Sequence, residues 1–189
     1  MIRQGTPEWV SERAKRLTAS DFASALGLNP YCSPQRLWRI KVGLEVVETN
    51  HHMQRGTDNE QQAIFDYQVA TGVLTDEVGL ACHPAHDWLA GTPDAAVGDD
   101  GLVEVKCPAQ IRSEPPPYHL AQMQGQLEIT DRDWCDYVQW HEGAITITRV
   151  ERDREWWERA SPVLAKFWAY VTALEQPPRG SIKMEKKAA

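Results

Sequence analysis

The sequence lacks a long hydrophobic run. No apolar stretch approaches the roughly 20 residues that a membrane-spanning helix needs. Residues 1–7 also contain no apolar core of the kind found in secretion signals. These absences predict a cytoplasmic protein that has no membrane partner.

Cysteine is scarce, and no two cysteines are close together in the chain. Zinc ribbons and iron–sulfur clusters need closely spaced cysteines such as Cys-x-x-Cys pairs. We therefore expect neither kind of centre, and in a cytoplasmic protein we expect free thiols. The four cysteines are Cys32, Cys82, Cys107 and Cys135.

Positive charge is also in short supply. The chain has 20 lysines and arginines against 27 aspartates and glutamates, a formal net charge of −7. This balance argues mildly against a nucleic-acid binder, because phosphate contacts need Lys and Arg. Basic residues gathered in one cleft, or acidic residues that hold metal ions, would remove the objection.

The chain of 189 residues, 42% of them hydrophobic, is long enough for one domain with a core. We expect this domain over residues 1–175, followed by a mobile tail, residues 176–189. Hydrophobic periodicity and turn residues predict an α/β fold in which helices flank a central mixed β-sheet. Helices are expected at 8–16, from 18 onward, and at 35–42, 51–70, 118–129 and 154–174, and strands within 73–83, 94–106, 134–140 and 144–150.

A β-hairpin carries the most informative residues. The turn signal at residues 98–101 separates Asp94 from a strand that contains Glu104 and Lys106. Because side chains alternate along a strand, Glu104 and Lys106 share one face and the neighbouring valines take the other. The hairpin brings Asp94 on the partner strand toward Glu104.

Two neighbouring carboxylates repel each other unless a cation neutralises them. Mg²⁺ prefers oxygen ligands and usually takes one or two carboxylates together with phosphate and water. The backbone carbonyl of Val105 is a further possible ligand. Lys106 can hold or deprotonate a water, or stabilise charge on a phosphate. This combination suits the attack of water on a phosphodiester.

Simpler interpretations of the hairpin stay open at this point. Glu104 and Lys106 could form a surface ion pair on an edge strand, worth about 0–1 kcal/mol. Asp94, which follows a proline, could merely shape a turn.

The segments Gly91-Thr92-Pro93-Asp94 and Glu104-Val105-Lys106-Cys107-Pro108 resemble the PD-(D/E)xK nuclease signature. More narrowly, the chain is similar to the lambda exonuclease and YqaJ-type viral recombinase family. The resemblance implies a restriction-endonuclease-like core. It rests on further segments in the same order, which are Trp9-x-x-x-Arg13, Thr18-Ala19-Ser20-Asp21, Gly56-x-x-x-Glu60 and Ala121-Gln122-Met123-Gln124.

The resemblance implies roles in a catalytic centre for residues at the matching positions. Asp94 and Glu104 would bind Mg²⁺, for which Mn²⁺ can substitute. Glu60 would join them from its helix, either directly or through a metal-bound water. Lys106 would orient or activate the attacking water.

The resemblance also implies contacts with DNA. Arg13, Ser20 and Gln122 would handle the phosphates, including a terminal 5′-phosphate, with Gln124 as the second choice after Gln122. Met53 would be an apolar wedge that parts the two strands.

Structural roles are possible for several of these residues. Glu60 could close a capping box that starts at Thr57, and Ser20 could serve only a helix start. Arg13 could belong to a solvated helix face, and Met53 to an ordinary core.

The function implied is that of a 5′→3′ exonuclease on double-stranded DNA ends, which releases 5′-mononucleotides and leaves a 3′ overhang. Such enzymes form homotrimeric rings and work with a single-strand annealing protein, and the chain would be encoded by a phage or prophage in a bacterial host. The alternatives are a related nuclease of other polarity, an endonuclease, or a non-catalytic module that binds DNA ends. The last is disfavoured because Glu60, Asp94, Glu104 and Lys106 are all present.

Overall fold

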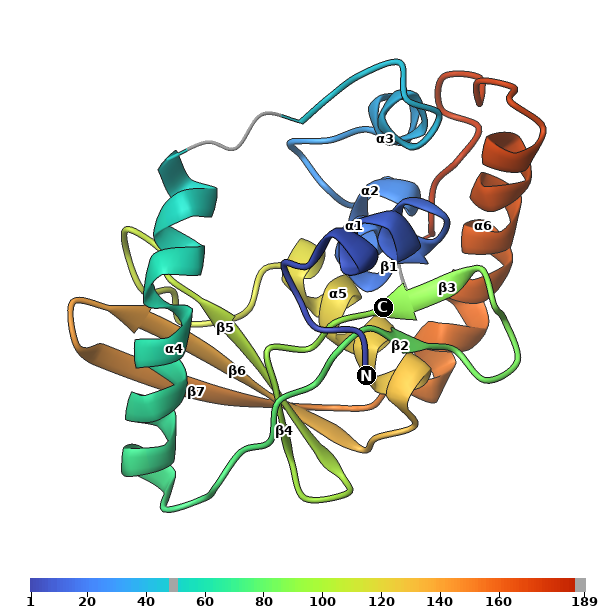
Figure 1. Ribbon diagram of the computed structural model, residues 1–189. Coiled ribbons are helices and arrows are strands. Elements are labelled where there is room, and N and C mark those ends of the chain that lie inside the picture. Colours follow the sequence, from blue (N-terminus) through green and yellow to red (C-terminus); the bar gives the residue numbers. More distant parts are fainter. Residues whose placement is uncertain (48–50, 186–189) are drawn as a thin grey trace.

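The computed structural model describes residues 1–47 and 51–185, and of residues 51–57 the backbone alone (Figure 1). None of the described helices is long and apolar enough to cross a membrane. The helices are α1 (Pro7–Ala14), α2 (Ala19–Ala25), α3 (Pro34–Lys41), α4 (His51–Thr71), α5 (Pro117–Thr130) and α6 (Arg154–Thr172). The strands are β1 (Leu17–Thr18), β2 (Ala81–Cys82), β3 (Leu89–Gly91), β4 (Ala95–Val97), β5 (Gly101–Lys106), β6 (Trp134–His141) and β7 (Ala144–Glu151).

The larger sheet has the strand order β4-β5-β6-β7. β4 and β5 form the predicted antiparallel hairpin, β5 runs parallel to β6, and β6 and β7 form a second hairpin. The sheet is therefore mixed, as predicted, and β5 is one of its inner strands. A smaller sheet has the order β1-β3-β2.

Helix α4 covers one face of the larger sheet, at the left of Figure 1. Ala63 and Tyr67 of this helix are buried against Val103, Val105 and Val138. Odd-numbered residues of β5 thus face α4, which confirms the alternation predicted for this strand.

Helix α5 covers the opposite face. Met123 and Leu127 are buried against Leu102 of β5 and Tyr137 of β6. The even-numbered residues of β5 therefore face α5, and Glu104 must lie on this covered face between two layers.

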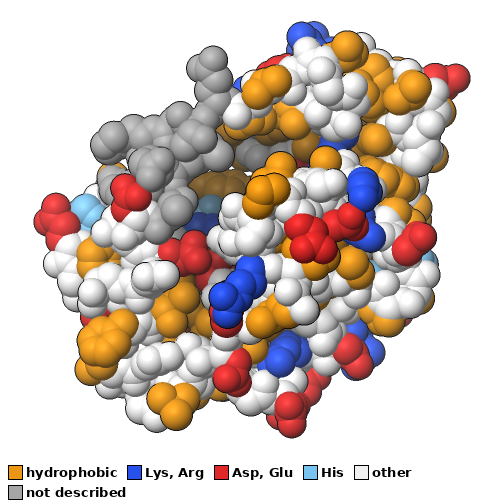
Figure 2. Space-filling model, viewed as in Figure 1, with side chains coloured by type: hydrophobic (Ala, Val, Ile, Leu, Met, Phe, Trp, Pro, Cys, Tyr) orange, Lys and Arg blue, Asp and Glu red, His pale blue; other side chains and the backbone are white. Residues whose placement is uncertain are grey.

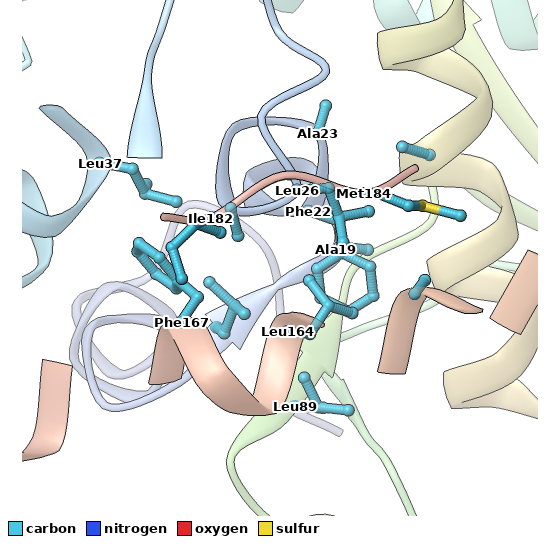
Figure 3. Close-up of a cluster of buried hydrophobic side chains, with 14 of the residues drawn as sticks. Ala19, Phe22, Ala23, Leu26, Leu37, Leu89, Leu164, Phe167, Ile182 and Met184 are labelled. Carbon is cyan, nitrogen blue, oxygen red and sulfur yellow. The ribbon is translucent and has the colours of Figure 1, made fainter. Parts of the chain in front are cut away.

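A third apolar cluster joins α2, α3 and α6 beyond α5 (Figure 3). Ile182 and Met184 are buried in it, and the Met184 N–H donates to the carbonyl of Leu26 at 2.9 Å. These two apolar side chains attach part of the C-terminal segment to the core, and the mobility of residues 176–189 stays a prediction.

Two expectations about local structure are wrong. Residues 73–83 do not form a strand pair or one long strand: they contain only β2 and an isolated bridge between Asp76 and Ala96. The longest helix begins at His51 and continues through Gly56, so Thr57 does not cap it. The short strands β1 and β3 were not predicted, because strands of two or three residues have too few positions to show a period.

Glycine is required at one helix contact. A Cβ atom at Gly125 of α5 would lie 2.5 Å from ring carbons of the buried Phe22 on α2. Carbon atoms in contact are normally separated by about 3.5–4.0 Å. Gly125 therefore allows α2 to lie close to α5, which brings Ser20 on α2 toward the face of α5 that carries Gln122.

We predict that Gly125→Ala destabilises the protein by about 1–2 kcal/mol. Alanine gains about 1 kcal/mol over glycine inside a helix, but overpacking typically costs about 1–3 kcal/mol. Urea unfolding measures the difference. Phe22→Leu should lower the penalty of Gly125→Ala when the two changes are combined, and an undiminished penalty in the double variant would exclude this clash as the cause.

Candidate active site

Asp94 lies at the start of the hairpin and is bound to the opposite strand. Its Oδ2 accepts a hydrogen bond of 2.6 Å from the backbone N–H of Val105. The register Ala95↔Val103 of β4 and β5, continued by one residue, places Asp94 opposite Glu104. The hairpin thus brings the two carboxylates together, as the sequence predicts.

Glu104 is buried, with only 1% of its surface exposed. Its Oε1 accepts hydrogen bonds from Lys106 Nζ and, at 2.7 Å, from Gln122 Nε2. Its Oε2 accepts one from Gln126 Nε2 at 2.8 Å. The interpretation of Glu104 and Lys106 as a surface ion pair on an edge strand is therefore wrong.

The electrostatics of the two carboxylates, Asp94 and Glu104, favour the binding of a cation. Burial raises the pKa of Asp94 well above its usual range, and the neighbouring charges of Glu104 and Glu60 raise that pKa further, while Lys106 lowers it. Burial lowers the pKa of Lys106, but Glu104 and Asp94 together raise it more, so the ammonium group stays charged. One lysine faces several carboxylates, and a divalent cation would relieve their repulsion.

Glu60 approaches this cluster from α4. Burial raises its pKa, and the charge of Glu104 raises it further. Glu60 and Asp94 also line one hollow of about 500 Å³. Since α4 begins at His51, the interpretation of Glu60 as part of a capping box is wrong.

A pocket of about 160 Å³ joins the carboxylates to Arg13 and Ser20, at the hollowed face seen in Figure 2. Arg13 Nη2 donates to Ser20 Oγ at 3.1 Å and to Thr18 Oγ1 at 3.4 Å. Arg13 therefore faces this pocket and does not belong to a solvated helix face. The pocket is lined by Gln4, Trp9, Arg13, Thr18, Ser20, Thr92, Asp94, Glu104, Lys106, Gln122 and Gln126.

The wall of the pocket beside Ser20 is fixed by a capping box. Asp21 Oδ2 accepts hydrogen bonds from the N–H and the hydroxyl of Thr18. Lys41 of α3 forms an ion pair of 2.7 Å with Asp21. The predicted start of α2 at Thr18 is confirmed, and it holds Ser20 beside Arg13.

Gln124, one of the residues proposed for DNA contacts, does not line this pocket, and the prediction for Met53 lies outside the described side chains. Gln124 is buried, and its amide binds the carbonyl of Glu151 and the N–H of Asp153, at the junction of β7 and α6. Residues two positions apart point to different sides of a helix, so Gln124 cannot accompany Gln122. Met53 lies on α4, where its side chain is outside the described residues.

Sequence reasoning missed other members of the pocket. Gln126 was not selected, although its spacing of four residues from Gln122 places both on one face of α5. The Trp9 ring lies under the Arg13 guanidinium at 4.2 Å, and its Nε1–H donates to Thr92 Oγ1 at 2.9 Å. Only the fold could reveal this last contact, because its partners are distant in the chain.

The donor set suits Mg²⁺. In the described part of the chain, no three His, Cys, Asp or Glu residues are grouped closely enough to hold a metal by themselves. Mg²⁺ does not need such a cage, since it usually takes one or two carboxylates and completes its shell with phosphate and water. Asp94 and Glu104 can supply those carboxylates, and a role of Glu60 through a metal-bound water stays a prediction. The Val105 carbonyl stays a prediction.

Comparison with known proteins agrees with the architecture. A model of the YqaJ-like viral recombinase domain matches residues 8–133. An uncharacterized protein of Acanthamoeba polyphaga mimivirus is 28% identical over 160 residues, which are 73% of this chain and 29% of that much longer protein.

Solved structures are similar over most of the chain. The alkaline exonuclease LHK-Exo of Laribacter hongkongensis has 32% sequence identity and a TM-score of 0.80, with 89% of this chain and 94% of that chain covered. Its complex with dAMP has a TM-score of 0.81 at the same identity and coverage. A phage-related exonuclease of Haemophilus somnus shares the fold, with a TM-score of 0.69 at 16% identity and coverage of 84% and 94%.

His119 of α5 gives a pH-dependent prediction. Its Nδ1 shares a hydrogen bond of 2.8 Å with Tyr137 Oη, and burial, followed by the charges of Lys106 and Arg112, lowers its pKa from 6.5 to about 3. Between these values the unfolded chain binds a proton that the folded chain does not, so stability falls as the pH falls.

We expect His119→Asn to flatten this dependence, by up to about 1.4 kcal/mol per pH unit at full effect. Urea unfolding at pH 7, 6 and 5 measures it for both proteins. Curves of free energy against pH that stayed parallel for the two proteins would show that His119 is protonated equally in both states.

Proposed function

The chain belongs to the YqaJ-like viral recombinase domain family, and on this premise we propose that it is a magnesium-dependent 5′→3′ exonuclease acting on double-stranded DNA ends. Its enzyme class is that of an exonuclease, a DNA phosphodiester hydrolase. The observation that carries the proposal is that Asp94, Glu104 and Lys106 share one pocket with Arg13 and Ser20.

The size of the pocket supports attack at a strand end. Its volume of about 160 Å³ is below the roughly 300 Å³ at which ordinary ligand pockets begin. It suits a phosphate group with part of one nucleotide. The dAMP complex of LHK-Exo, a protein with 32% identity, supports the release of mononucleotides here as well.

Each residue has a role that its position permits. Bound Mg²⁺ would lower the pKa of the attacking water and stabilise charge on the leaving 3′-oxygen. Asp94 and Glu104 hold the metal, with Glu60 assisting through water. Lys106, which donates to Glu104 beside the metal site, would orient or activate the attacking water and stabilise charge on the scissile phosphate.

The other end of the pocket supports the proposed 5′→3′ polarity. Arg13 and Ser20 offer a guanidinium and a hydroxyl close to each other, which together suit a terminal phosphate. Gln122 also lines the pocket, and its Nε2 donates a hydrogen bond to Glu104. If the 5′-terminal phosphate binds there, the first phosphodiester lies at the carboxylates, and the product is a 5′-mononucleotide.

The proposal extends to assembly and cellular context. We expect a homotrimeric ring around the duplex, in which the basic residues of a chain with net charge −7 need only line the channel. The 3′ overhang would be taken up by a single-strand annealing protein. The gene would belong to a phage or prophage, and Mn²⁺ would support activity in place of Mg²⁺.

A linear duplex with a label at either the 5′ or the 3′ terminus tests the reaction. With Mg²⁺ the 5′ label should be released early as a mononucleotide, and EDTA should stop the release because the carboxylates then lack their cation. Early release from the 3′ terminus would contradict the polarity. Cleavage of closed circular DNA would instead indicate an endonuclease.

Lys106→Ala should lower kcat on the same duplex by roughly 100- to 10,000-fold, the range for a group that assists proton transfer or charge development. Lys15→Ala is the matched control, because the Lys15 side chain is 63% exposed and forms an ion pair with Glu12 of α1. Activity of Lys106→Ala equal to that of the control would remove Lys106 from the mechanism.

A further inference from the structure

Gln126 is a buried residue that the proposed reaction does not yet use. Its side chain is 1% exposed and extends from α5 toward β5. Its Nε2 donates to Glu104 Oε2 at 2.8 Å and, more weakly, to the carbonyl of Thr92 at 3.4 Å. Gln126 therefore touches a carboxylate that would hold the metal.

The orientation of the Gln126 amide is forced. Both of its hydrogen-bond acceptors are oxygens, so only the NH₂ end can face them. The opposite end, Oε1, is buried and has no hydrogen-bond partner in the part of the chain that the structure describes. Buried polar atoms without partners are rare and call for an explanation. The unpaired Oε1 is the consequence of directing the amide nitrogen at Glu104.

The two carboxylate oxygens of Glu104 differ in how many lone-pair sites remain free of hydrogen bonds. Each carboxylate oxygen has about two lone-pair sites. Lys106 and Gln122 take both sites on Oε1, while Gln126 is the one described donor to Oε2. Oε2 thus keeps a site for a cation, and Gln126 is the described donor that contacts this oxygen directly.

We propose that Gln126 is a positioning residue for the divalent cation, acting by holding Glu104 Oε2 in the orientation in which it binds the metal. The inference rests on the proposed function, because it assigns the metal to Glu104. Partners that orient metal ligands commonly change metal affinity or activity by 10- to 100-fold when they are removed.

Gln124 provides a matched control on the same helix. It is also buried, at 7% exposure, and its amide also makes two hydrogen bonds, with Glu151 O at 2.7 Å and Asp153 N at 2.7 Å. These bonds join α5 to the β7–α6 junction and contact no member of the pocket. Loss of Gln124 therefore reports the effect of removing a buried amide without touching Glu104.

The experiment compares Gln126→Met with Gln124→Met in the full chain. Methionine keeps the length of the side chain and removes the amide. Binding of Mn²⁺ without DNA is measured by the electron paramagnetic resonance of the free ion. Both variants should lose some thermal stability in EDTA, but only Gln126→Met should bind Mn²⁺ 10- to 100-fold more weakly. Raising Mn²⁺ should then restore much of its nuclease activity.

A second variant, Gln126→Asn, keeps a buried amide but withdraws it from Glu104 by one methylene, and should weaken Mn²⁺ binding in the same range. Unchanged affinity in either Gln126 variant, or equal losses in Gln126→Met and Gln124→Met, would overturn the inference. Failure of the proposed function is a separate result: the wild-type chain would then bind Mn²⁺ without degrading DNA, and the comparison of affinities would still decide the role of Gln126.

Discussion

The structure depends on one burial that is unfavourable by itself, that of the Glu104 carboxylate between the sheet and α5. A charged group in a protein interior must be paired and hydrogen-bonded. Lys106, Gln122 and Gln126 meet this need from the same strand and from the facing helix. The remaining repulsion from Asp94 and Glu60 is what a divalent cation would relieve.

The strands and helices around Glu104 hold the side chains that contact it in place. β5 is an inner strand, so its valines anchor α4 on one face while Glu104 meets α5 on the other. Gly125 lets α2 lie close to α5, and α2 begins with the capping box that sets Ser20 beside Arg13. The core and the site therefore share the same helices. A change in helix packing is expected to move the side chains of the site.

The arrangement also resolves the apparent conflict between an acidic chain and a DNA substrate. The acidic residues that matter gather where a cation would neutralise them, and Arg13 and Lys106 supply positive charge within the same pocket. Net charge is a sum over the whole protein, whereas a bound phosphate is affected mainly by the electrostatic potential of the pocket.

By itself, the sequence determined the hairpin, the alternation that separates Glu104 and Lys106 from the valines, and the start of α2, because each follows from neighbouring residues and the geometry of one strand or helix. The family motifs added Arg13, Ser20 and Gln122. Only the tertiary structure decided that Glu60 approaches the carboxylates of the hairpin, that Ile182 and Met184 pack against the core, and that Gln124 and Gln126 have different tasks. These outcomes depend on contacts between residues far apart in the chain, which local patterns cannot encode.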